Sequence, residues 1–380
     1  GNIMPAKVII SDRIRFKKGL ISKKAMLTRY DRSVYDEVKC DKCDNLDNRH
    51  NEICDTCPAF IGRYRFFSQS EAKQGVWSVP QGDIIAVLKK LRSKHPDIVV
   101  KDTRPKIPFD NEIKFTGRLY KKGEVDAEGR ERADQVGILR KWWKHKHGVI
   151  QAAPRTGKTV MATAAYCYLG QKTVIIASQK EWLKQFYETA TGRTPPTYRG
   201  AKIIKQGRKA QRRKAVTNIR KLQRETGKEV IRFVEKFADL EKSTEYYDVI
   251  LMTYQALMKD PSRILKYLNG RYSMCVVDEQ HKGNAHAYMK VLAQLNVRHR
   301  LSLSATTKRK DSRDIFGRII MGPVVARSVT NALVPHIYFE PTGFVMKKPI
   351  PKMWPTVYKR ACYDLKRNKL IVKRVFEDLR

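Results

Sequence analysis

The stretch Ala152-Ala153-Pro154-Arg155-Thr156-Gly157-Lys158-Thr159 decides the fold of this 380-residue chain. An apolar run at 147–150 precedes it and an alanine-rich helical pattern follows it, which predicts a strand, a loop and a helix in succession. Backbone N–H groups at the start of such a helix bind phosphate, and the ammonium group of Lys158 would reach the β- and γ-phosphates. We therefore expect the run from Pro154 to Thr159 to bind ATP, with the Thr159 hydroxyl as a ligand of Mg²⁺. Ala152 stands at the first glycine position of the general motif, so the match is to a looser form.

The surrounding sequence predicts an α/β fold built on a parallel sheet. Short, continuous apolar runs separated by helical patterns are typical of strands that are buried on both faces of such a sheet. The predicted strands lie at 147–150, 173–176, 249–252, 274–277 and 300–303.

An acidic pair, Asp278 and Glu279, ends the fourth of these runs. Parallel strands present their carboxyl ends at one edge of the sheet, so we expect this pair to lie beside the phosphate loop. Asp278 would bind Mg²⁺, and Glu279 would orient and deprotonate the attacking water. An ordinary acidic strand end is the alternative interpretation.

These residues together resemble the superfamily 2 helicases and translocases, with Asp278 to His281 as a DEQH form of the DEAD/DEAH box. The resemblance implies a RecA-like motor domain, and further stretches match the family's motifs in order along the chain. Arg132 to Gln135 resembles the Q motif, whose glutamine recognises adenine. Ser178 and Thr253 lie in stretches that resemble the two strand-contacting loops. Ser304-Ala305-Thr306 resembles motif III, which couples hydrolysis to strand movement through His281.

Within the superfamily, the stretches 113–120 and 248–255 are most similar to the phage UvsW-type branch-migration helicases. Members of that group carry a small α/β domain ahead of the motor. Nothing in this sequence matches the arginine-finger motif of a second RecA-like domain, so we expect a truncated protein whose intact form carries the activity. The expected domains are a basic segment with zinc knuckles, an accessory α/β domain, the motor domain, and a linker with the start of a second domain, at 1–61, 62–125, 126–333 and 334–380 respectively.

The N-terminal quarter shows its own strand and helix patterns. Strand-like runs occur at 7–11, 63–67, 76–79, 98–100 and 113–115. We expect 76–79 to pair with a neighbouring run. Asp83 is a candidate N-cap for a helix over 84–91.

Four cysteines predict a zinc site. The spacing Cys40-x₂-Cys43-x₁₀-Cys54-x₂-Cys57 can place four thiolates tetrahedrally around Zn²⁺, although a redox pair is an alternative. Zinc would then stabilise a polar segment that has little apolar area of its own. Three further cysteines lie in apolar patterns and are expected in the core: Cys167, Cys275 and Cys362.

The charge of the chain predicts a nucleic-acid partner. Lys and Arg total 78 against 38 Asp and Glu, a net charge of +40. Such a chain gains affinity for nucleic acid by releasing the counterions of each phosphate it neutralises. The segment 199–228 is especially basic, and either it tracks a phosphate backbone or it is a solvated helical insertion. The candidate phosphate contacts in it are Arg208, Lys209, Arg212, Arg213 and Lys214.

Two adjacent tryptophans, Trp142 and Trp143, lie in a basic stretch before the phosphate-loop strand. Base stacking is one interpretation, but we expect both rings to pack in the core, because their helix leads into that strand.

The combined pattern predicts an ATP-dependent DNA helicase or translocase that remodels duplex or branched DNA in replication, recombination or repair. An RNA helicase and a non-catalytic nucleic-acid-binding module are the alternatives. No run of apolar residues is long enough to cross a membrane. The odd cysteine count and the absence of a secretory signal favour the cytoplasm, which would be that of an infected bacterium if a phage encodes the protein.

Overall fold

The computed structural model describes residues 6–35, 60–195, 214–241, 247–278, 286–304, 314–328 and 361–378. The chain divides into two units, 1–330 and 331–380. The second unit contains the helix α14 (Leu365–Asp378). No helix in the described parts of the chain is long and apolar enough to cross a membrane.

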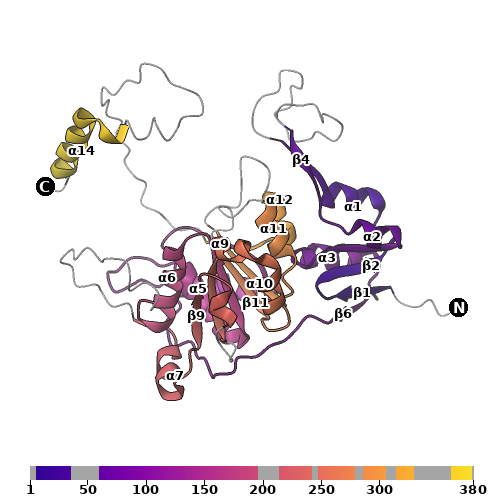
Figure 1. Cartoon of the computed structure of the whole chain (residues 1–380), viewed down its shortest axis with the longest axis horizontal. Coiled ribbons are helices and arrows are strands. Elements are labelled where there is room, and N and C mark those ends of the chain that lie inside the picture. The colour runs from indigo at the N-terminus through magenta and orange to yellow at the C-terminus, as the bar shows by residue number, and fades with distance from the viewer. Residues whose placement is uncertain are drawn as a thin grey trace. The chain divides into compact units, whose positions relative to one another are not determined.

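A seven-stranded sheet forms the centre of the first unit (Figure 1). All of its neighbouring strands are parallel, in the order β13-β7-β12-β11-β8-β10-β9. The strands are β7 (His147–Ala152), β8 (Thr173–Ala177), β9 (Ile231–Val234), β10 (Val249–Thr253), β11 (Met274–Asp278), β12 (His299–Ser304) and β13 (Val324–Ser328). The five predicted strands and the parallel α/β architecture are therefore confirmed. The two edge strands, β9 and β13, were not predicted, because each is short and interrupted by an arginine.

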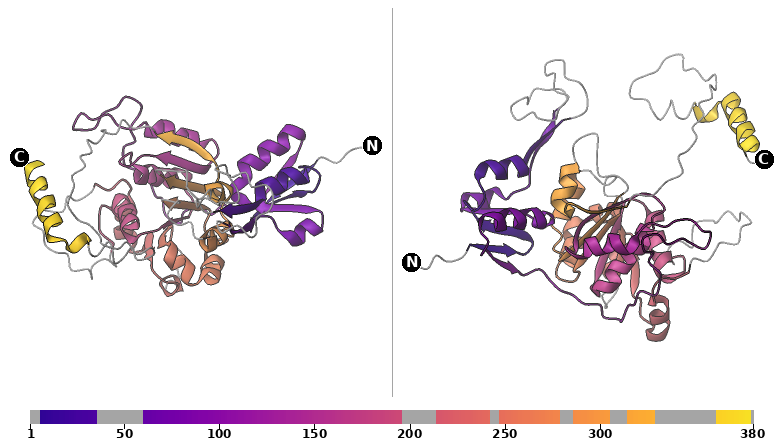
Figure 2. Two further views of the ribbon diagram at one scale, coloured as in Figure 1. Left: turned by 90° about the horizontal axis from the view of Figure 1, so that it is seen from above. Right: turned by 180° about the vertical axis from the view of Figure 1, so that it is seen from behind.

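Helices cover both faces of this sheet (Figure 2). On one face lie α4 (Gln135–Trp143), α5 (Lys158–Leu169), α6 (Lys180–Thr191) and α7 (Ile219–Thr226). On the other lie α8 (Ala238–Glu241), α9 (Tyr254–Lys259), α10 (Pro261–Leu268), α11 (His286–Ala293) and α12 (Asp314–Met321). Successive strand residues serve the two layers in turn, since Ile175 packs in the first core and Ile176 in the second. This is why the strands are continuously apolar.

A four-stranded sheet precedes the large one, in the order β5-β2-β1-β6. Its strands are β1 (Lys7–Ile10), β2 (Arg13–Lys17), β5 (Val76–Pro80) and β6 (Val99–Asp102). The helices α1 (Lys23–Tyr30), α2 (Gln69–Lys73), the 3₁₀ turn η1 (Gln81–Asp83) and α3 (Ile84–Lys94) accompany it, and β3 (Asp31–Tyr35) pairs with β4 (Phe60–Arg65). The sheet thus combines strands from both N-terminal segments that the sequence analysis separated, and 76–79 pairs with β2.

One local prediction in this region was wrong, and a second was confirmed in position only. Residues 113–115 form no strand; Phe115 makes an isolated bridge to Thr217, because this segment hydrogen-bonds to the chain near α7 and joins no sheet. Asp83 does occupy the N-cap position of α3, but its carboxylate makes no capping bond. It accepts hydrogen bonds from Arg29 and Tyr30, and a charge-assisted bond to a guanidinium is stronger than one to a backbone N–H.

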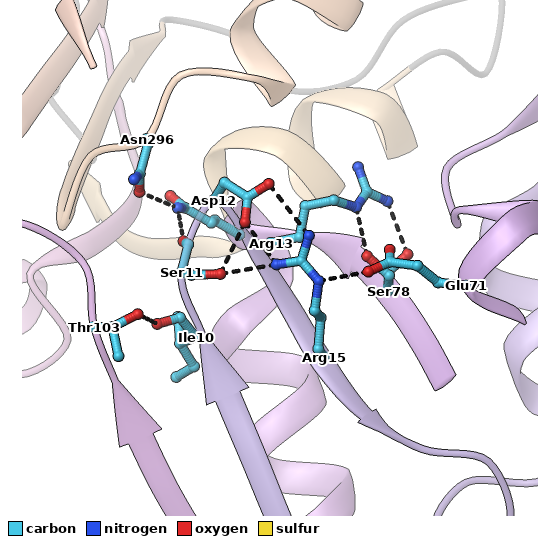
Figure 3. Close-up of polar contacts among 10 residues, drawn as sticks. Ile10, Ser11, Asp12, Arg13, Arg15, Glu71, Ser78, Thr103 and Asn296 are labelled. Carbon is cyan, nitrogen blue, oxygen red and sulfur yellow. Dashed lines mark hydrogen bonds and ion pairs between the residues drawn. The ribbon is translucent and has the colours of Figure 1, made fainter. Parts of the chain in front are cut away.

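A polar network orders the small sheet. In Figure 3, Arg13 of β2 donates to the hydroxyl and carbonyl oxygens of Ser78, each over 2.8 Å. Arg15 donates to Glu71 of α2 over 2.6 Å and to Asp12 over 2.6 Å. Each guanidinium therefore ties β2 to a different neighbour.

The turn between β5 and α3 attaches the small sheet to the large one. The Gln81 side chain donates to the carbonyl of Ser11 and to Asn296 Oδ1, the latter over 2.8 Å. A Cβ on Gly82 would lie 1.9 Å from the carbonyl oxygen of Ile320 in α12, so only glycine fits at this position. The turn that follows β5 is consequently in close backbone contact with α12.

Candidate nucleotide site at the carboxyl edge of the sheet

The strand register brings the predicted motifs to one edge of the large sheet. Ser304 at the end of β12 pairs with Gln151 of β7, and Asp278 at the end of β11 pairs with Leu303. On the other side of β11, Ala177 of β8 pairs with Thr253 of β10. All seven strands are parallel, so their carboxyl ends and the loops that follow lie along the same edge.

The phosphate loop leaves β7 and enters α5 through two left-handed residues. Gly157 has a φ of 82° and Arg155 a φ of 65°, and the second value is uncommon for a residue with a side chain. The Thr156 hydroxyl donates to the carbonyl of Ala153 over 2.8 Å and so closes the loop. Gly157, the N-cap residue of α5, has no side chain to cap the helix, so the first-turn N–H groups could bind an anion at this loop.

The side chain of Gln135 stabilises this loop by a hydrogen bond. Its side-chain amide donates to the carbonyl of Thr156 over 2.9 Å and accepts from the Tyr120 N–H over 3.1 Å, and the residue is buried. A Cβ on Gly157 would lie 2.3 Å from the Gln135 amide nitrogen. Glycine is therefore required at 157 by conformation and by space.

Tyr120 is a component of this site that sequence reasoning missed. Two guanidinium groups lie near its ring, with the Cζ of Arg118 at 5.0 Å and that of Arg132 at 5.3 Å from the ring centroid. Arg132 also donates to the carbonyl of Arg155 over 3.5 Å. The only sequence signal was an aromatic residue in the stretch 113–120, because no spacing rule connects Tyr120 with Gln135.

The two loops expected to contact a nucleic-acid strand lie side by side. The Thr253 hydroxyl accepts from the Ala256 N–H over 3.1 Å and so caps α9. Gln255 donates to the carbonyl of Ser178 over 3.2 Å and ties the loops together. The Ser178 hydroxyl is buried and has no hydrogen-bond partner among the described residues. The Thr253 hydroxyl only accepts in this bond, so its own proton and the backbone N–H groups are the donors that this loop could offer.

Other predicted site residues are only partly covered by the structure. Ser304 is buried and Lys214 is exposed. Outside the described residues lie Glu279, His281, Ala305, Thr306, Arg208, Lys209, Arg212, Arg213, Cys40, Cys43, Cys54 and Cys57. Their roles, and the zinc site, stay predictions. The described residues contain no cluster of three or more potential metal ligands.

The three remaining cysteines divide between core and surface. Cys167 and Cys275 are buried, and burial raises the pKa of both thiols, that of Cys275 to about 12. The prediction for Cys362 was wrong, because it is exposed. Its apolar neighbours belong to a short helical segment of the second unit.

Comparisons with known proteins give one family match and several similar solved structures. Residues 128–309 match the family model described as "Type III restriction enzyme, res subunit". No curated protein matches the chain. The UvsW helicase from bacteriophage T4 is a solved structure with 13% identity and a TM-score of 0.44, covering 84% of this chain and 99% of its own.

Two archaeal structures are also similar. A hypothetical ATP-dependent RNA helicase from Sulfolobus tokodaii has 16% identity and a TM-score of 0.35 over 51% of each chain. A SWI2/SNF2 ATPase core from Sulfolobus solfataricus, in complex with dsDNA, has 17% identity and a TM-score of 0.33, covering 55% of this chain and 38% of its own. The family match spans the same residues that carry the phosphate loop and the aligned strand ends, and this part of the chain is therefore a domain of the superfamily 2 helicase type.

Proposed function

We propose that this chain is the ATP-binding part of a DNA helicase or translocase that remodels duplex or branched DNA in replication, recombination or repair. The observation that carries the proposal is the single edge formed by the ends of β7, β12, β11, β8 and β10. The residues proposed for nucleotide chemistry follow the first three of these strands, and those proposed for strand contact follow the last two. An edge arranged in this way can couple hydrolysis to movement.

Mg²⁺-ATP would be held by oxygen and nitrogen donors of this edge. The Thr159 hydroxyl and the Asp278 carboxylate are both oxygen ligands of the kind that Mg²⁺ prefers, and they follow strands separated only by β12. The ion would neutralise charge that develops on the transferred phosphoryl group. Lys158 and the first-turn N–H groups of α5 would orient the phosphates, while Glu279 would activate the attacking water.

DNA is the favoured nucleic acid for two reasons. The stretches 113–120 and 248–255 resemble the phage UvsW-type helicases, and the description of the matching family is that of a restriction enzyme subunit. An RNA helicase remains the second candidate, because motor loops that contact phosphates do not distinguish the two polymers.

ATP turnover tests this assignment. We expect stimulation by single-stranded or branched DNA to exceed that by RNA of equal length, measured on the intact protein by phosphate release. Glu279→Gln should retain ATP binding but slow hydrolysis by about 10²-fold or more, because the phosphate contacts stay while the base is lost. Stimulation by RNA alone would assign the second candidate, and an absence of turnover would assign a non-catalytic binding module.

We further propose that the basic insert tracks the phosphate backbone. Reversing the charges of Arg208, Lys209, Arg212, Arg213 and Lys214 should weaken binding to unrelated DNA sequences equally. It should also flatten the dependence of log affinity on log salt, which is about 0.9 per phosphate contact on duplex DNA. An unchanged slope would identify the insert as a solvated surface segment.

The cysteine cluster is proposed to bind one Zn²⁺ per chain through Cys40, Cys43, Cys54 and Cys57. Metal analysis of protein purified without chelator should find about one equivalent of zinc, and alanine at any one of the four should release it. Protein that is free of metal, with four titratable thiols, would contradict the proposal.

A further inference from the structure

The amino edge of the large sheet carries a second surface. Two neighbouring cavities of about 490 Å³ and about 600 Å³ lie beside the end of α4. Trp143 and Tyr168 line both, and their side chains are prominently exposed, with relative accessibilities of 37% and 59%. Trp142, in contrast, is fully buried and donates its indole N–H to the carbonyl of Arg300 over 3.2 Å. The expectation that both tryptophans pack in the core was therefore correct for Trp142 only.

Cations surround these two rings. Lys106 and Lys146 line the smaller cavity, and Arg140 and Lys144 line the larger. None of the four is paired with a carboxylate among the residues that the structure describes. The surface is thus a set of exposed aromatic faces bordered by cations that have no acidic partner in the described chain.

The acidic content of the surface is low and already engaged. Asp102 is the one acid among the described residues that line either cavity. Its carboxylate pairs with Arg104 over 2.8 Å and with Arg298 over 3.2 Å. The available charge of the surface is therefore positive, which complements an anionic ligand.

Local geometry presents the rings and the cations together. Arg140, Trp143 and Lys144 stand at i, i+3 and i+4 and so share one face of α4 and its C-terminal turn. Lys146 has a φ of 50°, a left-handed conformation that a lysine seldom adopts, and its ammonium nitrogen lies 5.1 Å from the Trp143 ring centroid.

We propose that this surface, which we call the amino-edge platform (Lys106, Arg140, Trp143, Lys144, Lys146 and Tyr168), binds single-stranded nucleic acid. Bases stack on Trp143 and Tyr168, and phosphates are neutralised by the four cations around them. Stacking on exposed rings requires unpaired bases, which is why the ligand is a single strand and not a duplex.

The platform is distinct from the motor's own strand contacts. It lies where β7 and β12 begin, since His147 and His299 line the smaller cavity, whereas Ser178 and Thr253 follow strand ends at the opposite edge. The platform therefore holds a second segment of the strand or a second strand, and it does not need ATP turnover. This inference extends the proposed function and can fail without it.

Oligonucleotide binding without nucleotide tests the platform. The probes are fluorescent (dT)₂₀ and (rU)₂₀, with inorganic polyphosphate as an anion that has no bases. Trp143→Ala combined with Tyr168→Ala should weaken binding of both oligonucleotides by about ten-fold or more, from the loss of two stacking faces, and leave polyphosphate binding unchanged. Trp143→Phe combined with Tyr168→Phe should retain most of the affinity. Equal weakening of polyphosphate and oligonucleotide would overturn base stacking and with it the proposal.

Charge reversal provides the matched comparison. Lys144→Glu combined with Lys146→Glu should lower oligonucleotide affinity and reduce the salt slope by about 1.4, at about 0.7 per phosphate on a single strand. Lys266→Glu combined with Lys290→Glu changes the net charge equally on exposed helix positions of α10 and α11 and should have a much smaller effect. Equal changes of oligonucleotide affinity and salt slope in the two double variants would overturn the proposal. Competition by polyglutamate but not by oligonucleotide would also overturn it and would identify an acidic protein partner. Basal ATP turnover without nucleic acid should be the same in all variants as in the parent protein. If neither the parent protein nor any variant hydrolysed ATP, that result would count against the proposed function and not against the platform.

Discussion

The two edges of the seven-stranded sheet are organised in opposite ways. At the carboxyl edge, the contacts that shape the phosphate loop are short in sequence: Thr156 bonds to Ala153, and Gln135 bonds to Thr156 twenty-one residues away. The longer tie at this edge, from Gln255 to Ser178, spans 77 residues. At the amino edge, partners are far apart, since Gln81 and Arg300 are separated by 219 residues. The first edge is a set of local loops suited to binding and release, while the second joins two sheets that are distant in sequence.

Arg300, at the amino edge, is a buried cation that is held by carbonyl groups. The side chain is fully buried and donates to the carbonyls of Leu295 and Leu292 over 2.5 and 3.3 Å, and to Gln81 over 3.5 Å. Burial lowers the pKa of Arg300 to about 10, so the guanidinium stays charged at neutral pH. Among the described residues this buried cation has no carboxylate partner, and it is tolerated because carbonyl dipoles surround it, which demands a rigid framework.

Replacing Lys158, a cation of the carboxyl edge, should have the largest effect. We expect it to lower ATP turnover and to leave stability nearly unchanged. Lys158→Ala should reduce ATP turnover by about 10³-fold, equivalent to about 4 kcal/mol, because the developing phosphate charge loses its mobile point charge. The unfolding midpoint should change little, since Lys158 begins a helix whose packing lies further along α5. A comparable loss of stability would break the distinction between the two edges.

Adding one methyl group at Gly82, at the amino edge, should change stability and not activity. Gly82→Ala places a Cβ against the carbonyl of Ile320, and backbone must move, so we expect a loss of about 3 kcal/mol in the free energy of unfolding. Chemical denaturation measures it. Gln81→Ala is the control, because it removes polar contacts without a clash and should cost about 1 kcal/mol. An unperturbed Gly82→Ala protein would mean that the two sheets are not held together by this turn.

Acid should weaken the amino edge, where two buried histidines lie. Burial, with the nearby charges of Arg104, Arg298 and Lys146, lowers the pKa of His299 to about 4, and burial beside Arg300 lowers that of His147. The unfolded chain therefore binds more protons than the folded one below about pH 6.5, and stability is lost as the pH falls from there towards 4.

The expected loss from His299 is about 2 kcal/mol over that interval, measured by denaturation at several pH values. His299→Gln cannot titrate, so its stability should depend less steeply on pH than that of the parent protein. An equal slope in both proteins would show that the histidines of this edge remain accessible to protons in the folded state.

The contrast between the edges also explains what the sequence could predict. The phosphate loop, Asp278 and the five central strands were predictable, because each is encoded in a few consecutive residues with a fixed period or spacing. The docking of Gln81 onto Arg300 was not, since no local pattern reports a pair that is 219 residues apart. The exposure of Trp143 and the place of Tyr120 in the site were not predicted for a related reason. Both depend on which segments pack nearby, and the sequence does not distinguish Trp143 from the adjacent Trp142.

Replacing Gln135, which hydrogen-bonds to the phosphate loop, should have the smallest effect. It also tests whether the loop depends on this contact or holds its shape through its own residues. Gln135→Ala deletes the donor to the Thr156 carbonyl and the acceptor for the Tyr120 N–H, and it leaves Lys158 in place. Loss of a net-favourable hydrogen bond of this kind is worth about 1 kcal/mol, so the affinities for ATP and for GTP should each fall about five-fold, because the amide contacts the loop and Tyr120 and not a base. Titration of a fluorescent nucleotide analogue, with ATP and GTP as competitors, measures both quantities. Gln294→Ala is the matched control, because that exposed glutamine of the opposite edge also donates one bond to a carbonyl, yet its loss should alter neither. If Gln135→Ala bound both nucleotides as the parent protein does, the loop would hold its shape through Thr156 and Gly157 alone, and Gln135 would be a buried packing residue.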